Sequence, residues 1–379
     1  MHIVADENIP FLEAFFAGLP GITRLERLPG RQLQRSQLTG CDALLVRSVT
    51  PVNQALLAET PIRFVGTATI GTDHVDHDWL HQQGIAFASA PGCNAEGVVD
   101  YVLSTLVRHC QQQQVSLWQR SVGIVGAGNV GGRLWRRLQA LGVRVHACDP
   151  PRQMAGERGL ESLEAILQQD LICLHTPLTT SGPHATLHLL DGPRLAALKG
   201  HQLLLNAGRG PVVDNGALVS RLQQPDAPRV CLDVWEGEPQ VMLGLLPLVW
   251  QGSPHIAGYS LEGKARGTAM LYQAFCRHLG LTPQVKLAEV LPPPLQMSVT
   301  GGGEAPLTQA ILAAYDPRGD QERFMASQQG SQELRAQGFD QLRKTYPVRR
   351  EYASHRVAGI KDLATARLFT AAGFTVAED

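Results

Sequence analysis

Three short polar segments in the second half of the chain carry side chains that could do chemistry together. They are residues 206–210 (NAGRG), 233–239 (DVWEGEP) and 253–259 (SPHIAGY). Arg209 stands between two glycines, which leave its guanidinium room to hold a carboxylate with two hydrogen bonds. His255 could take a proton from a hydroxyl group, and a neighbouring carboxylate, either Glu238 or Glu236, would stabilise the resulting imidazolium. This set of groups suits hydride transfer between a nicotinamide and a secondary alcohol that also carries a carboxylate.

A glycine-rich turn earlier in the chain has the spacing of a dinucleotide-binding loop. It reads GAGNVG at residues 126–131, between an apolar run and a helical pattern, so that its backbone could approach a pyrophosphate at the N-terminus of that helix. Asp149, 18 residues after the last glycine, ends the next apolar run and is placed to bind the adenosine ribose. An acid there repels a 2′-phosphate, which predicts NAD as the cofactor. Arg152 is the counter-argument, because it could bind the 2′-phosphate of NADP. The turn residues expected at the cofactor are Gly126, Gly128, Asn129, Val130 and Gly131.

Short apolar runs alternate with helical patterns along most of the chain, which predicts an α/β fold with parallel strands and right-handed crossovers. The expected strands of a first sheet are residues 2–5, 43–46, 63–66 and 86–89. Those of a second sheet are residues 121–125, 144–148, 171–174, 202–205 and 229–232, after a long helix at 94–110. Both sheets are expected to be doubly wound, which puts the polar segments of the second one at strand carboxyl ends, where α/β proteins bind ligands.

A change of composition near residues 285–305, with PPP and then GGG, predicts a separate small α+β unit at the end of the chain. Its expected elements are a strand at 296–300, helices at 306–315 and 363–372, and a strand at 374–376. The expected domains are residues 1–93 with 258–285, residues 94–257, and residues 286–379.

The composition argues against several classes of protein. Lys and Arg number 33 against 34 Asp and Glu, a formal charge of −1, so there is no overall basic field to hold nucleic acid or an anionic membrane. No stretch approaches the ~18 apolar residues of a membrane span, and the first residues lack a secretory pattern, which predicts a cytoplasmic protein. The 7 cysteines are widely spaced, which predicts buried thiols rather than disulfides or a zinc site.

The order and spacing of the glycine turn, Arg209, Glu238 and His255 resemble the pattern of the D-2-hydroxyacid dehydrogenases. The resemblance implies that Arg209 binds the substrate carboxylate, that His255 is the acid and base, and that Glu238, rather than Glu236, holds the histidine. It also implies a substrate domain, a Rossmann NAD domain and the cofactor NAD. Residues 64–76 (FVGTATIGTDHVD) and 260–267 (SLEGKARG) extend the resemblance to the branch of the family that oxidises 4-phospho-D-erythronate in vitamin B6 biosynthesis.

Further site residues are implied by the resemblance alone. Those expected at the substrate are Ser48, Thr69 and Tyr259, and those expected at the cofactor, besides the turn and Asp149, are Thr176, Ala207, Arg209, Asp233 and Gly258. Hydroxyl groups on loops suit a phosphorylated polyhydroxy acid, although Ser48 and Thr69 are also residue types typical of turns. Residues 286–379 resemble a dimerisation domain, which implies a homodimer.

Two other functions stay open at this point: the same chemistry on another acid, such as 3-phosphoglycerate, and a binding protein that senses NAD(H). A metal site is not predicted. His77 and His81 share one helical face among carboxylates in residues 72–81 (TDHVDHDWLH), but acids are common at helix starts. Hydride transfer to NAD also requires no metal.

Overall fold

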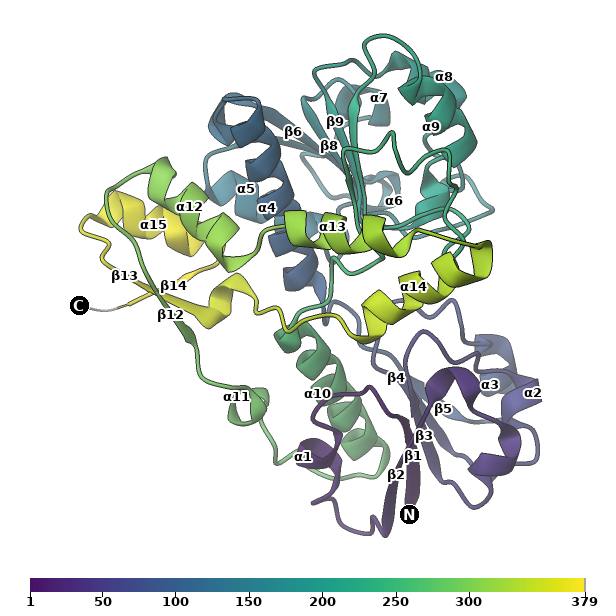
Figure 1. Cartoon of the computed structure of the whole chain (residues 1–379). Coiled ribbons are helices and arrows are strands. Elements are labelled where there is room, and N and C mark those ends of the chain that lie inside the picture. The colour runs from purple at the N-terminus through teal and green to yellow at the C-terminus, as the bar shows by residue number, and fades with distance from the viewer. Residues whose placement is uncertain (378–379) are drawn as a thin grey trace. The chain divides into compact units, whose positions relative to one another are not determined.

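The computed structural model describes residues 1–377 and divides the chain into two compact units (Figure 1). The first unit consists of residues 1–94 and 260–293, and the second of residues 95–259 and 294 onward. The C-terminal segment, which the change in composition sets apart, is thus grouped with the unit that contains the glycine-rich turn. The chain passes between the two units three times along its length.

The first unit is built on a parallel sheet of five strands in the order β2-β1-β3-β4-β5. The strands are β1 (His2–Asp6), β2 (Arg24–Leu28), β3 (Ala43–Val46), β4 (Phe64–Thr67) and β5 (Ala86–Ala88). The helices of this unit are α1 (Leu12–Phe16), α2 (Gln54–Leu57), α3 (His77–Gln82), α10 (Leu261–His278) and α11 (Leu287–Val290). The inner strands β3 and β4 are buried at successive positions because both faces of the sheet are covered.

Side chains from alternate strand positions enter two separate cores of the first unit. Ile3 and Leu45 pack with α1 and α10, whereas Val4 and Leu44 pack with α2 and α3. The long helix α10 returns to this sheet from far along the chain and contributes a large apolar surface, which includes Phe275.

The second unit holds a parallel sheet in the order β11-β10-β9-β8-β6-β7. Its strands are β6 (Ser121–Val125), β7 (Arg144–Cys148), β8 (Leu171–Leu174), β9 (Leu203–Asn206), β10 (Arg229–Leu232) and β11 (Gln251–Gly252). Leu160 adds an isolated bridge beside β7, so the strand order agrees with that of the Rossmann fold. The order reverses between β6 and β8, and dinucleotides bind at such a switch point.

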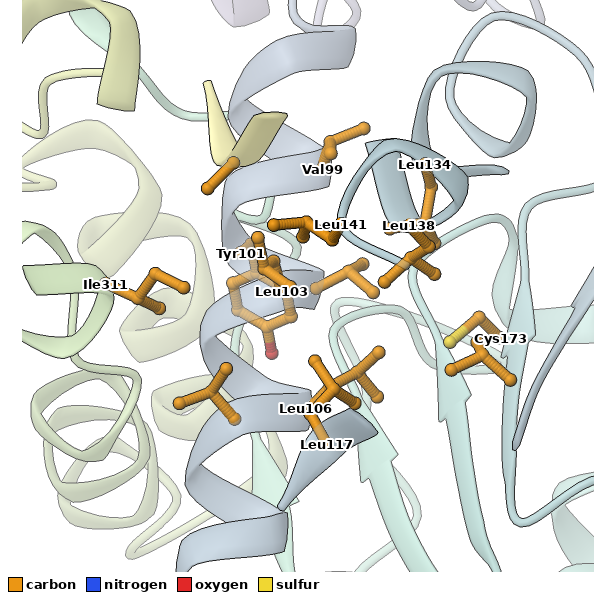
Figure 2. Packing of buried hydrophobic residues seen from close by; sticks show 14 of the residues in the cluster. Val99, Tyr101, Leu103, Leu106, Leu117, Leu134, Leu138, Leu141, Cys173 and Ile311 are labelled. Atoms are coloured by element: carbon orange, nitrogen blue, oxygen red, sulfur yellow. The ribbon is translucent and has the colours of Figure 1, made fainter. Parts of the chain in front are cut away.

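Helices cover both faces of this second sheet. They are α4 (Ala95–Gln112), α5 (Gly131–Ala140), α6 (Pro150–Met154), α7 (Leu163–Ile166), α8 (Gly192–Ala197) and α9 (Asn215–Leu222). Figure 2 shows Leu103 and Leu106 of α4 near Leu134 and Leu138 of α5, and Cys173 of β8 belongs to the same cluster. The opposite face holds residues of α7, α8 and α9.

The C-terminal segment adds a small parallel sheet, β12-β13-β14, and four helices to the second unit. The strands are β12 (Leu295–Ser298), β13 (His355–Ala358) and β14 (Thr375–Val376), and the helices are α12 (Glu304–Ala314), α13 (Arg318–Ser327), α14 (Gln332–Lys344) and α15 (Leu363–Ala372). Helices α12 and α15 lie beside α4 and α5 (Figure 1), and Ile311 of α12 and Phe369 of α15 join the core there. Phe324 of α13 and Phe339 of α14 join the core on the opposite face of the Rossmann sheet.

The α/β fold class predicted from the sequence is confirmed, with boundaries that move by one or two residues. The strands β2, β11 and β13 and the helices α13 and α14 were not predicted. β2 reads RLERL and lies at a sheet edge, where charged side chains are tolerated, so it lacks the apolar run of the inner strands.

All seven cysteines are buried free thiols, as expected. Within residues 1–377, no helix combines the length and apolar character that a bilayer crossing requires.

Candidate active site

The glycine-rich turn joins β6 to α5 at the switch point of the Rossmann sheet. Gly126 has φ +89°, and a Cβ there would lie 2.9 Å from the backbone of His175. A Cβ on Gly131 would lie 1.9 Å from the carbonyl oxygen of Gly126, so only glycine allows the helix to start so close to the strand. A Cβ on Gly128, by contrast, would meet no atom within 4 Å. The turn is therefore closed on its inner side and open at Gly128, where a pyrophosphate has room.

Asp149 follows β7 and caps the first turn of α6. Its Oδ2 accepts a hydrogen bond from the Ala127 N–H at 2.9 Å, and its Oδ1 accepts one from the Arg152 N–H at 3.1 Å. The carboxylate is thereby fixed beside the glycine-rich turn, as a ribose-binding acid must be. The guanidinium of Arg152, which could bind the 2′-phosphate of NADP, donates a hydrogen bond to Glu157 in this structure.

The end of β8 carries polar atoms for which the described part of the protein offers no partner. The Thr176 hydroxyl is buried and makes no hydrogen bond within residues 1–377. Both ring nitrogens of His175 are likewise buried and have no hydrogen-bond partner among these residues. Burial lowers the pKa of His175 to about 4, so its ring is neutral at physiological pH. An orphaned hydroxyl at a switch point fits a cofactor contact, since a buried polar group normally finds a partner. His175 was not singled out from the sequence, and its place just after an apolar strand was the available signal.

The Arg209 loop follows β9 and is tied down by the side chain of Asn206. Asn206 Oδ1 accepts a hydrogen bond from the Gly208 N–H at 3.1 Å, and its Nδ2 donates to the Arg209 carbonyl at 2.9 Å. A Cβ on Gly210 would lie 2.1 Å from the carbonyl carbon of Trp235, so the loops after β9 and β10 touch at this glycine. Ala207, expected at the cofactor, lies in the same loop.

His255 and Glu238 face each other across the loops that follow β11 and β10. The His255 Nδ1 and the Glu238 Oε1 are 2.5 Å apart, and Glu238 Oε2 accepts a hydrogen bond from the Trp235 N–H at 3.1 Å. Burial alone would raise the pKa of Glu238, but the charge and hydrogen bond of His255, the Trp235 N–H and the charge of Arg343 hold it below its ordinary value. Glu238 is thus a carboxylate whose contact with Nδ1 fixes the orientation of the imidazole.

Asp233 organises the loop that carries His255. Its Oδ1 accepts hydrogen bonds from the Ser253 hydroxyl at 2.7 Å and the Ile256 N–H at 2.8 Å, and its Oδ2 accepts one from the Ala257 N–H at 3.0 Å. Burial raises the pKa of Asp233 and outweighs the opposing effects of His255 and of these donors. The hydrogen bonds that the structure gives to Asp233 therefore hold the histidine loop, and its expected contact with the cofactor stays a prediction.

Glu236, the other candidate partner for His255, is turned toward a different part of the unit. Its Oε1 is 2.6 Å from His188 Nε2, and its Oε2 accepts a hydrogen bond from the Asn215 N–H at 3.1 Å. The structure therefore brings Glu238, and not Glu236, to the histidine.

Tyr259 follows the histidine loop, and Gly258 lies between it and the backbone that Asp233 holds. The Tyr259 hydroxyl accepts a hydrogen bond from Arg343 Nε at 3.2 Å, and its ring packs edge-on against Tyr346 at 5.8 Å. Residues of the C-terminal segment thus contact a tyrosine that is expected to touch the substrate.

Ser48 and Thr69 belong to the first unit, where each follows one of two neighbouring strands, β3 and β4. Ser48 is exposed. The Thr69 hydroxyl lies 2.8 Å from that of Thr67 and donates to the Gly71 carbonyl at 3.0 Å. Both hydroxyls therefore lie at the carboxyl edge of this sheet, where α/β proteins bind ligands.

The acid- and histidine-rich residues 72–81 have ordinary structural contacts. Asp76 caps helix α3 through the Trp79 N–H at 3.0 Å, and His77 contacts Thr72 and the ring of Phe87. Asp76 and His77 are thus engaged by other groups of the protein.

Comparisons with known proteins agree with this geometry. Residues 100–257 match the family model for the NAD binding domain of D-isomer specific 2-hydroxyacid dehydrogenases, and residues 290–373 match a model described only as a domain of unknown function. The D-lactate dehydrogenase of Aquifex aeolicus, solved with NAD and lactic acid, shares the fold with a TM-score of 0.60 at 22% identity, over 74% of this chain and 96% of that one.

Curated relatives match nearly the whole chain. The erythronate-4-phosphate dehydrogenase of Marinobacter nauticus is 52% identical over 365 residues, and that of Pseudomonas fluorescens is 51% identical over 362 residues. Each match covers 94% of this chain and 94% of the relative. The chain therefore belongs to the erythronate-4-phosphate dehydrogenases, within the D-2-hydroxyacid dehydrogenase family.

Proposed function

We propose that this protein oxidises 4-phospho-D-erythronate at C2 to 2-oxo-3-hydroxy-4-phosphobutanoate, with reduction of NAD, as a step in vitamin B6 biosynthesis. The observation that carries the proposal is the 2.5 Å contact between His255 Nδ1 and Glu238 Oε1, in a chain 52% identical to a protein named for this substrate. Neither 3-phosphoglycerate as substrate nor a purely NAD(H)-sensing role is favoured by any contact in the site.

The roles of the residues follow from their contacts. Because Glu238 occupies Nδ1, the Nε2 of His255 is the nitrogen that takes the proton from the C2 hydroxyl. Arg209, held by Asn206, binds the substrate carboxylate and polarises the forming carbonyl group. Bound NAD supplies the hydride acceptor. Gly128 leaves space for its pyrophosphate, and Gly126, Asn129, Val130 and Gly131 are assigned to the cofactor as parts of the same turn. The remaining cofactor contacts are assigned to Asp149, Thr176, Ala207, Arg209, Asp233 and Gly258.

The substrate hydroxyls are assigned to Ser48, Thr69 and Tyr259, whose side chains can donate or accept hydrogen bonds. Residues 1–93 with 258–285 would then form the substrate domain and residues 94–257 the NAD domain. We assign residues 286–379 to dimerisation, in a cytoplasmic homodimer. The separate family match of residues 290–373 supports a distinct role for this last segment.

The test measures NADH fluorescence with 4-phospho-D-erythronate, 3-phosphoglycerate and a panel of 2-oxo acids for the reverse reaction. We expect the wild type to turn over 4-phospho-D-erythronate fastest, and His255→Asn to lower kcat about 10²- to 10⁴-fold because the proton acceptor is lost. Faster turnover of 3-phosphoglycerate would overturn the substrate assignment. NADH binding without turnover of any acid would favour a sensing role.

A further inference from the structure

Arg343 lies in the last turn of α14, in the C-terminal segment, and is held beside the histidine loop. Its Nε donates to the Tyr259 hydroxyl at 3.2 Å, and its guanidinium carbon lies 5.8 Å from the centre of the Tyr259 ring. Tyr346, one turn further along the chain, packs on the same ring. The C-terminal segment thus places a cation against Tyr259, which follows His255 by four residues in the sequence.

The charge of Arg343 reaches the catalytic pair. It contributes to holding the pKa of Glu238 below its ordinary value. Burial alone would lower the pKa of Arg343 itself, but Tyr259 and Glu238 outweigh this effect and raise it. Because Arg343 is half-buried, its guanidinium interacts more strongly with an anion than a fully exposed one would.

The outer nitrogens of Arg343 are not used by the protein. Among residues 1–377, neither Nη1 nor Nη2 makes a hydrogen bond, and no carboxylate lies within 4.0 Å of the guanidinium. Other arginines of the segment differ, because Arg318 is paired with Asp316 and Arg323 with Asp320. Arg343 therefore presents two adjacent N–H groups of the kind that bind an oxyanion in two-pronged fashion.

We propose that Arg343 binds the phosphate group of the substrate. The inference rests on the proposed function, because it takes the substrate to be a hydroxy acid with a carboxylate at one end and a phosphate at the other. Arg209 is assigned to the carboxylate, so the second anionic group needs a second cation. In this unit Arg343 has two outer nitrogens without protein partners and contacts a tyrosine expected at the substrate.

The experiment compares two substrates that differ only in the phosphate, 4-phospho-D-erythronate and D-erythronate, with wild type and Arg343→Ala. We expect the ratio of kcat/KM for the phosphorylated acid to kcat/KM for D-erythronate to fall about 100-fold in the variant, because charge-assisted hydrogen bonds to the phosphate are lost. Loss of the contacts of Arg343 with Tyr259 and Glu238 affects both acids alike. Inorganic phosphate, used as a competitive inhibitor of the wild type, should bind at least tenfold more weakly to the variant. Arg343→Lys should recover part of the lost kcat/KM, since lysine restores the positive charge but not the pair of adjacent N–H donors.

Two other variants serve as controls. Arg367→Ala removes an exposed arginine of α15 in the same segment and should leave all these constants unchanged. Arg47→Ala tests the other cation that a sugar-acid phosphate could meet, a residue that follows β3 and lies 3.7 Å from Asp6.

Three results would overturn the proposal: equal losses for both substrates in Arg343→Ala, no loss for either, or a phosphate-specific loss in Arg47→Ala but not in Arg343→Ala. NADH binding, followed by fluorescence, should be the same in wild type and Arg343→Ala, so a general collapse of the site would be recognised. Failure of the proposed function is distinguishable, because the wild type would then oxidise neither acid.

Discussion

At the scale of single residues, the two glutamates of residues 233–239 show what spacing can and cannot decide. Both stand within a few residues of the end of a strand and could have served as the partner of His255. The resemblance to the family favoured Glu238, and the structure places Glu238 at 2.5 Å from the histidine and turns Glu236 to His188. Residue types alone left this choice open, because it depends on how the loop turns between positions 235 and 238.

The two glutamates form a matched pair for mutation. Glu238→Gln should lower kcat about 100-fold, because the imidazolium loses its stabilising charge, with little change in the Kd of NADH. Glu236→Gln should change kcat less than twofold, since this side chain contacts His188 and the Asn215 N–H instead. Steady-state kinetics and NADH fluorescence measure both. The reverse order of effects would show that the pairing in the structure is not the one used in catalysis.

At the scale of elements, the loops after the strands of the Rossmann sheet are held by close backbone approaches at glycines. Gly131 lets α5 begin against β6, and Gly210 lets the Arg209 loop touch the backbone at Trp235. Gly128 lies in the same kind of loop, but its missing Cβ faces open space. Glycine therefore has two roles here, and only a structure separates the packing role from the ligand-binding role.

Alanine substitution should separate these roles. Gly210→Ala forces a Cβ to within 2.1 Å of the Trp235 backbone and should lower the free energy of unfolding by about 1–3 kcal/mol. Gly128→Ala should leave the free energy of unfolding unchanged and raise the Kd of NAD at least tenfold, because the new methyl group occupies the space for the pyrophosphate. Urea denaturation and NADH fluorescence measure the two effects. Tight NAD binding by Gly128→Ala would place the cofactor elsewhere.

At the scale of the whole molecule, the sequence predicted the two parallel sheets because their inner strands are continuous apolar runs. The nine predicted strands of these sheets all exist, and the loops of Arg209 and Glu238 follow two of them, whereas the His255 loop follows β11, which was not predicted. The glycine turn and Asp149 were predicted from motif spacing, whereas the substrate residues Ser48, Thr69 and Tyr259 and the further cofactor residues came from the family resemblance.

The parts that were missed lack a signal of this kind. β11 has two residues, and β13 alternates buried and half-exposed positions over only four. The helices α13 and α14 bury few apolar side chains, among them Phe324 and Phe339, so their patterns are weak. Arg343 was missed because its importance depends on contact with Tyr259, 84 residues away in sequence.

Buried neutral histidines should make the stability of the protein depend on pH. Burial lowers the pKa of His109 to about 4, far below its ordinary value of 6.5. The unfolded chain therefore takes up this proton first, and stability falls as the pH drops from about 6.5 to about 4, by about 3 kcal/mol for this residue. His109→Phe keeps the ring contact with Trp250 and should remove most of that loss.

Urea denaturation at several pH values measures this dependence. His81→Gln, at an exposed position of α3, is the control and should leave the pH dependence unchanged. A His109→Phe variant with the same acid sensitivity as the wild type would show that other groups govern it.

The return of α10 to the first sheet has a consequence for how the protein is made. Residues 1–94 leave the ribosome long before residues 261–278, which include the Phe275 and Leu271 side chains that cover Ile3 and Leu45. At about 5–20 residues per second, that surface lacks the covering of α10 for roughly 10 to 40 seconds of synthesis. The N-terminal strands emerge first but acquire their full covering late, so during translation this is the region with the greatest need of a chaperone.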